Sequence, residues 1–205
     1  GTMKKMFQMA LCALMFTLAP AVVFAKAGLP THAQKQQKIS VLPSDSLYQI
    51  ATKWTRQDGK VVTLRSFAGH PVLLAMVYAS CRASCPLIVN EMQRVERALP
   101  ANQRAKVRFV LVTFDPVRDT PERLLAYAKL RHLDAARWSL LHGTDDQIRE
   151  LSVLLGMHYR NTGNGMFVHD SLITLLDEQG RVTVRHTQLT GPIADLTQAI
   201  AKMEQ

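Results

Sequence analysis

Cys81 and Cys85 stand four positions apart in the segment CRASCP, and Pro86 follows the second cysteine directly. A pair of thiols at this spacing can form a disulfide, exchange with a disulfide of another protein, or share a metal ion. Free cysteine is also a small apolar side chain that is often buried without doing chemistry. The residues around the pair are therefore needed to distinguish redox chemistry, metal binding and simple packing.

His169, in the segment GMFVHD, is the third candidate for chemistry, because it enters a strand expected beside the cysteines. Two thiolates and a neutral imidazole form a soft donor set that suits copper, Cu(I) above all, and zinc would accept it with a fourth ligand. Met166 and Asp170 could be outer ligands. For these two we favour simpler roles, with Met166 packed and Asp170 facing solvent or capping the loop.

The elements around the cysteines should bring the two sulfur atoms together. The apolar run 71–79 predicts a strand buried on both faces, and the cysteines follow its end. Proline is favoured in the first turn of a helix, so we expect Cys85 as the N-cap and Pro86 as the first helical residue. A thiol there faces unpaired N–H groups and the positive end of the helix dipole, which predicts that Cys85 is the more acidic cysteine.

The rest of the chain alternates between strands and helices. Asp58-Gly59 predicts a hairpin within 48–64, and helix 86–99 should expose Glu91 and Arg94 opposite an apolar stripe. Further strands are expected at 106–114, 138–141, 171–176 and 182–186, and further helices at 120–132, at 145–155 and after Pro192. This order predicts an α/β protein with a thioredoxin-like fold, a central mixed sheet flanked by helices and an N-terminal β-hairpin.

The N-terminus has the pattern of a secretory signal. Gly1 and Thr2 precede a methionine, two lysines, an apolar run and small residues that end near Ala25. We therefore expect residues 1–25 to be removed, 26–46 to be a flexible tether and 47–205 to be the folded domain; an uncleaved membrane anchor is the alternative. Cleavage would leave Cys81 and Cys85 as the remaining cysteines, in an oxidising compartment such as the periplasm.

The charge of the chain limits its partners. The 205 residues carry a formal net charge of +9, but the basic residues are scattered and form no run interleaved with aromatic residues. This distribution argues against nucleic-acid binding. An acidic protein partner or the headgroups of a membrane would suit the charge.

Two redox functions on the same fold remain as alternatives. Thioredoxin-like oxidoreductases usually have a CxxC pair and a cis-proline opposite it. Here the spacing between the two cysteines is one residue longer, and no proline lies between Pro121 and Pro192. A peroxidase would use one acidic cysteine, but Tyr78 occupies the position three before Cys81 where peroxiredoxins carry a small hydroxyl residue. The pair could still reduce disulfides of a partner.

Three segments together resemble the Sco (SenC) family of copper chaperones for cytochrome c oxidase assembly. They are CRASCP, VTFDPVRDTPE at 112–122 and FVHDSLITLLDEQG at 167–180, and the resemblance extends over about 58–184. It differs at Asp170, where a serine is common in the family. The predicted cleavage of the N-terminal segment is a second difference, since many members of the family are membrane-anchored.

The resemblance implies a thioredoxin-like fold in which Cys81, Cys85 and His169 bind one copper ion, as Cu(I) or Cu(II). It implies delivery of copper to an oxidase subunit or another acceptor, or reduction of the acceptor's cysteines, with a thiol reductase as a further partner. It also implies a place near an electron-transport membrane. Asp115, Arg118 and Asp119 match the DPxRDTP motif and should hold a loop, with Asp119 as a candidate neighbour of the metal ligands.

Overall fold

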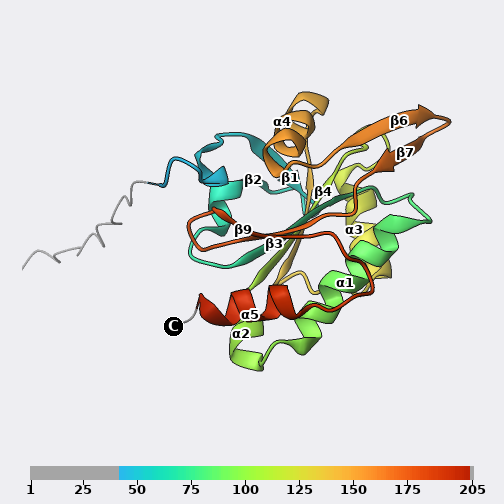
Figure 1. Cartoon of the computed structure of the whole chain (residues 1–205). Coiled ribbons are helices and arrows are strands. Elements are labelled where there is room, and N and C mark those ends of the chain that lie inside the picture. The colour runs from blue at the N-terminus through green and yellow to red at the C-terminus, as the bar shows by residue number, and fades with distance from the viewer. Residues whose placement is uncertain (1–41, 204–205) are drawn as a thin grey trace, which may run out of the picture. The chain divides into compact units, whose positions relative to one another are not determined.

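A seven-stranded mixed sheet lies at the centre of the computed structural model, which describes residues 42–203 (Figure 1). The described residues all belong to one compact unit. The predicted secretory signal and residues 26–41 of the predicted tether lie outside the described residues. Ser46, near the end of that predicted tether, is buried and caps the 3-10 turn η1 (Leu47–Gln49).

Three parallel strands form the middle of the sheet. They are β3 (Val72–Val77), β4 (Arg108–Thr113) and β5 (Trp138–His142), within the strand order β2-β1-β5-β4-β3-β8-β9. All six residues of β3 are buried, as expected for a strand covered on both faces. Because the carboxyl ends of parallel strands meet at one edge of a sheet, Phe114 after β4 and the cysteine loop after β3 lie at the same edge.

Antiparallel strands complete both sides of the sheet. The predicted N-terminal hairpin is confirmed as β1 (Lys53–Arg56) paired with β2 (Val61–Thr63) around Asp58-Gly59, and β1 also pairs with β5. On the other side, β8 (Ile173–Leu176) pairs with β3 and with β9 (Val182–His186). The predicted α/β class and thioredoxin-like arrangement are therefore confirmed.

Helices cover the sheet on both sides, with α1 and α5 on one side and α4 on the other in Figure 1. The capping box of Thr144 and Gln147 and the left-handed Gly156 confirm the predicted limits of α4. The helices are α1 (Ser84–Ala98), α2 (Ala101–Lys106), α3 (Pro121–Leu130), α4 (Asp145–Leu155) and α5 (Ala194–Lys202), and a second 3-10 turn, η2, spans Leu64–Phe67. The short helix α2 was not predicted.

Helix α1 begins two residues earlier than predicted. Ala83 is its N-cap and Ser84 its first residue, so Cys85 lies within the first turn and is not the cap. Pro86 is then the third helical residue. The N–H groups of the first turn have no partner within a helix, so a proline there loses no hydrogen bond and does not fix the starting residue.

A two-stranded hairpin projects from the sheet in Figure 1 and was not predicted from the sequence. It consists of β6 (Tyr159–Gly163) and β7 (Met166–His169), which pair with each other and with no other strand of residues 42–203. Asn164 and Gly165 form its turn with positive φ angles of 51° and 72°. Asn-Gly is a strong hairpin signal, so this dipeptide could have revealed the element. His169 ends β7 and does not belong to the following strand of the main sheet.

Glu91 does not face solvent as predicted, because its side chain lies in a buried polar cluster between α1, β9 and α5. The residue is 1% exposed. Arg94 donates to its carboxylate at 2.6 Å, and Nε2 of His186 lies 3.8 Å from Oε1. His186 also contacts the Asp195 carboxylate through Nδ1 at 2.8 Å. The cluster therefore ties the helix that carries Cys85 to the C-terminal helix.

Replacement of Arg94 by alanine should destabilise the protein more than is usual for the replacement of a partly exposed residue. The Glu91 carboxylate would stay buried without its guanidinium partner, which is expected to cost about 3 kcal/mol of the free energy of unfolding. Urea denaturation measures this value. Arg97→Ala is the control, since Arg97 is exposed on the same helix and should change stability by less than about 0.5 kcal/mol. Equal stabilities of the two variants would contradict the cluster's role.

Candidate metal centre

Cys81, Cys85 and His169 come together at the sheet edge where β3 and β4 end. Their ligand atoms all lie within 4.8 Å of one another. Cys81 lies in the loop after β3, Cys85 in the first turn of α1, and His169 at the end of β7. Within residues 42–203, this is the set of histidine, cysteine and carboxylate side chains that could hold a metal ion. Two sulfur donors and one nitrogen donor at these separations fit a soft metal ion.

The orientation of the His169 ring puts the lone pair of the neutral imidazole on Nε2, the atom nearest the cysteines. Nδ1 lies 2.8 Å from the carbonyl oxygen of Asp170. A carbonyl oxygen can only accept, so Nδ1 carries the hydrogen and Nε2 of the neutral ring keeps its lone pair. Nε2 is 3.4 Å from Sγ of Cys85. The hydrogen bond to Asp170 thus fixes the tautomer that a metal site needs.

A cluster of aromatic rings packs against the imidazole of His169 and holds it in position. The centroid of the Phe114 ring lies 5.0 Å from the centroid of the imidazole, and that of Tyr78 lies 6.2 Å from it. Phe114 also packs against Phe167 and Tyr159 of the β6–β7 hairpin, with centroid separations of 5.3 Å in both cases. The end of β4 therefore holds the hairpin, and with it the imidazole, against the cysteine loop.

The loop 115–119 holds the neighbouring segments in place, as predicted for the DPxRDTP motif. Arg118 pairs with the Asp115 carboxylate and donates to the carbonyl oxygen of Gly165 at the hairpin turn. A side chain at Gly165 would collide with the Arg118 guanidinium, so glycine permits this approach. Asp119 accepts hydrogen bonds from the Ala79 N–H at 2.8 Å and from the Thr113 hydroxyl at 2.7 Å. These contacts fix both the hairpin and the start of the cysteine loop.

The prediction that Cys85 is the more acidic thiol is wrong. Cys85 is 0% exposed, and this burial raises the pKa of its thiol well above the ordinary value. Burial also acts to raise the pKa of Cys81, but hydrogen bonds from the backbone N–H groups of Cys85 and Ala83 outweigh it and lower that pKa. Backbone N–H groups at the start of α1 thus donate to the sulfur of Cys81, whereas Cys85 is fully buried.

Alkylation of the reduced protein with iodoacetamide near neutral pH tests this assignment. We expect Cys81, which is 8% exposed, to react at least about tenfold faster than Cys85, because thiolate content and access control the rate. Peptide mapping by mass spectrometry follows each cysteine separately, with the denatured protein as the control for intrinsic reactivity. Faster modification of Cys85 would contradict the assignment.

The two candidate outer ligands lie apart from the cluster. Met166 is 63% exposed, so the expectation that it packs is wrong. The Asp170 carboxylate pairs with His158, whose Nδ1 lies 2.7 Å from it. Hydrogen bonds from the backbone and the ring of His158 lower the pKa of Asp170. Asp170 therefore caps the start of β6, one of the two roles expected of it.

Ser84 and Phe114 also contact the candidate ligand His169, although neither was predicted as a site residue. The Ser84 hydroxyl oxygen lies 2.9 Å from Nε2 of His169. Nothing in the sequence distinguishes this serine from other loop serines. The aromatic residue at the end of a buried strand was a usable signal for Phe114, because that strand was predicted to end beside the cysteine loop.

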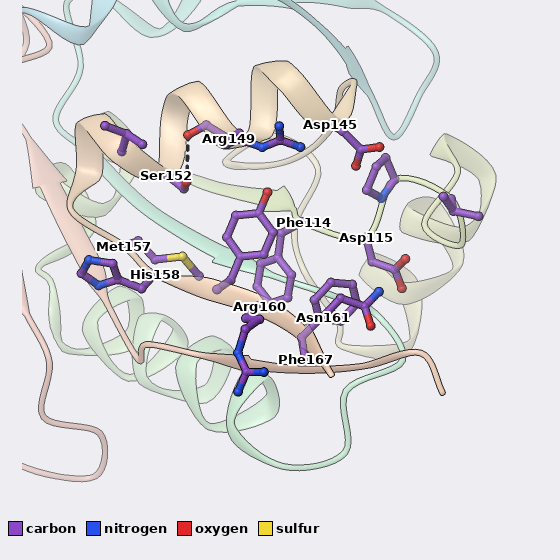
Figure 2. A pocket seen from close by; sticks show the side chains of 14 residues that line it. Phe114, Asp115, Asp145, Arg149, Ser152, Met157, His158, Arg160, Asn161 and Phe167 are labelled. Atoms are coloured by element: carbon purple, nitrogen blue, oxygen red, sulfur yellow. Dashed lines mark hydrogen bonds between the residues drawn. The ribbon is translucent and has the colours of Figure 1, made fainter. Parts of the chain in front are cut away.

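A pocket of about 550 Å³ lies on the far side of the aromatic cluster, between α4 and the hairpin. Figure 2 shows the rings of Phe114 and Phe167 at the pocket, with Arg149 and Ser152 reaching it from α4. Neither cysteine lines this pocket, and His169 does not line it either. The candidate metal centre is therefore separate from it, with Phe114 and Phe167 lying between them.

No helix within 42–203 combines the length and apolar character needed to cross a membrane.

Comparisons with known proteins relate this chain to one family and its fold. The SCO1/SenC family model matches residues 45–205. An SCO2-like protein of Rickettsia typhi is 29% identical over 139 residues, which cover 65% of this chain and 66%, just under two thirds, of that protein. The structure of a SCO1/SenC family lipoprotein from Bacillus anthracis covers 75% of this chain and 93% of that chain at 23% identity, with a TM-score of 0.69.

A third similar protein was solved with copper bound. The structure of Bradyrhizobium japonicum ScoI with copper covers 74% of this chain and 96% of that chain, at 26% identity and a TM-score of 0.63. The family match spans most of the chain and includes the cysteine loop, the 115–119 loop and the His169 hairpin. The chain is a member of the SCO1/SenC family.

Proposed function

We propose that this protein is a copper metallochaperone that binds one copper ion through Cys81, Cys85 and His169. The observation that carries the proposal is the convergence of two thiol sulfurs and one imidazole nitrogen within 4.8 Å. Membership of the SCO1/SenC family and the copper-bound structure of B. japonicum ScoI support the choice of metal.

The donor set suits a protein that both binds and releases copper. Thiolates favour Cu(I), and an imidazole nitrogen extends the set toward Cu(II). The cysteines must be reduced and deprotonated to bind, so loading depends on redox state and pH. Cys81 and His169 both retain some exposure at the surface. An acceptor's ligands can therefore approach the ion from the side of these two residues.

We further propose that the acceptor is a copper centre of a respiratory oxidase, or another copper-accepting protein, reached in the periplasm. The family match and the predicted secretory signal support this assignment. Inner-membrane anchoring through residues 1–25 is the alternative to release by cleavage. A thiol reductase would be needed to keep the cysteine pair reduced in an oxidising compartment.

Anaerobic titration of the reduced protein with Cu(I), with a chromophoric chelator as competitor, tests the binding function. A Cys12→Ser background limits the thiols to the candidate pair. We expect one copper ion per chain, and loss of this tight site in Cys81→Ser and in Cys85→Ser. Unchanged stoichiometry and affinity in both cysteine variants would contradict the proposal.

A thiol-disulfide reductase is the second candidate function, favoured by the proximity of two unbridged thiols and the lowered pKa of Cys81. Such an enzyme would reduce the cysteines of the acceptor's copper site, with the pair itself oxidised to a disulfide. The discriminating measurements are the reduction potential of the pair and its rate of exchange with a partner disulfide. Negligible exchange near neutral pH would leave copper binding as the function.

A further inference from the structure

The Ser84 hydroxyl lies against the candidate metal centre without being one of its sulfur or nitrogen donors. Its oxygen is 2.9 Å from Nε2 of His169, and Ser84 is the first residue of α1. Nε2 carries no hydrogen in the neutral ring, because Nδ1 donates to the carbonyl oxygen of Asp170. The hydroxyl is therefore the donor of this hydrogen bond and Nε2 is the acceptor.

This hydrogen bond uses the lone pair that copper would use. An imidazole nitrogen has a single lone pair in the plane of the ring, so it cannot accept from a hydroxyl and coordinate a metal at the same time. The bond between Ser84 and His169 therefore belongs to the metal-free protein. It must break when copper binds to Nε2, and it can form again when copper leaves.

The orientation of His169 does not depend on Ser84 alone. Nδ1 is held by the Asp170 carbonyl group, and the ring packs against Phe114 and Tyr78. Loss of the hydroxyl would leave these three contacts in place, together with the 3.4 Å approach of Cys85 Sγ to Nε2. Removing it should therefore destabilise the empty site more than it disturbs the loaded one.

We propose that Ser84 is a positioning residue that occupies Nε2 of His169 in the empty protein and so promotes copper release. This inference rests on the proposed function, because it requires copper on Nε2. Ser84 would stabilise the empty state by one net hydrogen bond, which corresponds to about a fivefold decrease in copper affinity. Such competition for Nε2 suits a protein that delivers its ion, because the imidazole regains a hydrogen bond as the copper leaves.

Copper affinity of Ser84 variants, measured by chelator competition, tests the inference. Ser84→Ala should bind Cu(II) about fivefold more tightly than the natural protein. Ser84→Thr keeps the hydroxyl and should restore an affinity within about twofold. Unchanged or weaker binding by Ser84→Ala would overturn the inference, because the hydroxyl would then have no effect or would help to hold the ion.

A second measurement uses the metal-free protein and does not depend on copper. The ¹⁵N chemical shift of Nε2 of His169 should change in Ser84→Ala and return in Ser84→Thr, because the acceptor loses and regains its donor. Ser80→Ala is the matched control, since the buried Ser80 hydroxyl, beside Cys81, has no hydrogen-bond partner among the described residues. An Nε2 shift unchanged in Ser84→Ala, or changed equally in Ser80→Ala, would overturn the inference.

The two experiments separate failure of the inference from failure of the proposed function. If the natural protein binds no copper, the proposed function fails, and the role of Ser84 in copper release fails with it. The Nε2 shift then still reports whether the hydrogen bond exists in the metal-free protein. If copper binds but the Ser84→Ala affinity does not rise, the inference alone fails.

Discussion

Replacement of His169 by alanine is expected to weaken Cu(II) binding at least about a hundredfold. Loss of a residue that merely orients a metal ligand typically costs 10- to 100-fold, and a direct ligand should cost more. Cu(I) binding should weaken less, because the thiolates of Cys81 and Cys85 supply the soft donors that this ion prefers. Chelator competition with each oxidation state under anaerobic conditions measures both affinities.

His158→Ala is the control for this experiment. His158 has an exposed side chain near the same hairpin and pairs with the Asp170 carboxylate, but it does not belong to the Cys81, Cys85 and His169 cluster. Its replacement should leave copper affinity within about threefold of the natural value, since a contact between exposed side chains contributes little. Equal losses in the two variants would contradict the assignment of His169 as a ligand.

Replacement of Phe114 by alanine is expected to have the largest combined effect on stability and binding. Removal of this buried ring should lower the free energy of unfolding by about 3–5 kcal/mol. It should also lower Cu(II) affinity by about tenfold or more, because the ring holds both His169 and the hairpin in place. Urea denaturation and chelator competition measure the two effects separately.

Phe109→Ala distinguishes positioning from general destabilisation. Phe109 is equally buried on β4 and stacks on Trp138 with ring centroids 4.7 Å apart. It precedes Phe114 by five residues, roughly 16 Å along an extended strand. Its loss should cost similar stability but leave copper affinity unchanged. Copper affinities that fall equally in the two variants would contradict a positioning role for Phe114. Phe114→Leu and Phe109→Leu provide the same comparison with a smaller loss of stability.

The main sheet and much of the site could be predicted because short segments of sequence determine them. The apolar runs around β3 and β4, the Asp58-Gly59 turn and the Thr144 capping box each specify an element from nearby residues. The ends of parallel strands meet at one edge of a sheet, so the position of the cysteine loop followed from the order of the elements.

Tertiary contacts outweigh local sequence patterns at the positions where the predictions were wrong. Helical periodicity placed Glu91 opposite the apolar stripe, but α1 packs against both β3 and α5 and so has more than one buried side. The polar pattern of β6 gave a weak strand signal, whereas Phe167 and Gly165 anchor the hairpin to Phe114 and Arg118. Such partners are distant in sequence, and local patterns do not reveal them.

The acidity of the two cysteines illustrates the same limit. Backbone N–H groups at the start of α1 do lower a thiol pKa, but the thiol that accepts their hydrogen bonds is Cys81, in the approach loop. Cys85 is in that turn and fully buried, so the loss of hydration raises the pKa of its thiol instead. Sequence position alone could not separate the direction of the N–H groups from the depth of burial.

X-ray absorption spectroscopy at the copper edge, on the reduced and stoichiometrically loaded protein, tests the central claim most directly. We expect two sulfur scatterers from Cys81 and Cys85 and one imidazole nitrogen from His169, and we expect this two-sulfur spectrum to be absent from each single cysteine variant. Copper surrounded by nitrogen and oxygen atoms alone, or a spectrum that the cysteine substitutions leave unchanged, would contradict the proposed copper site.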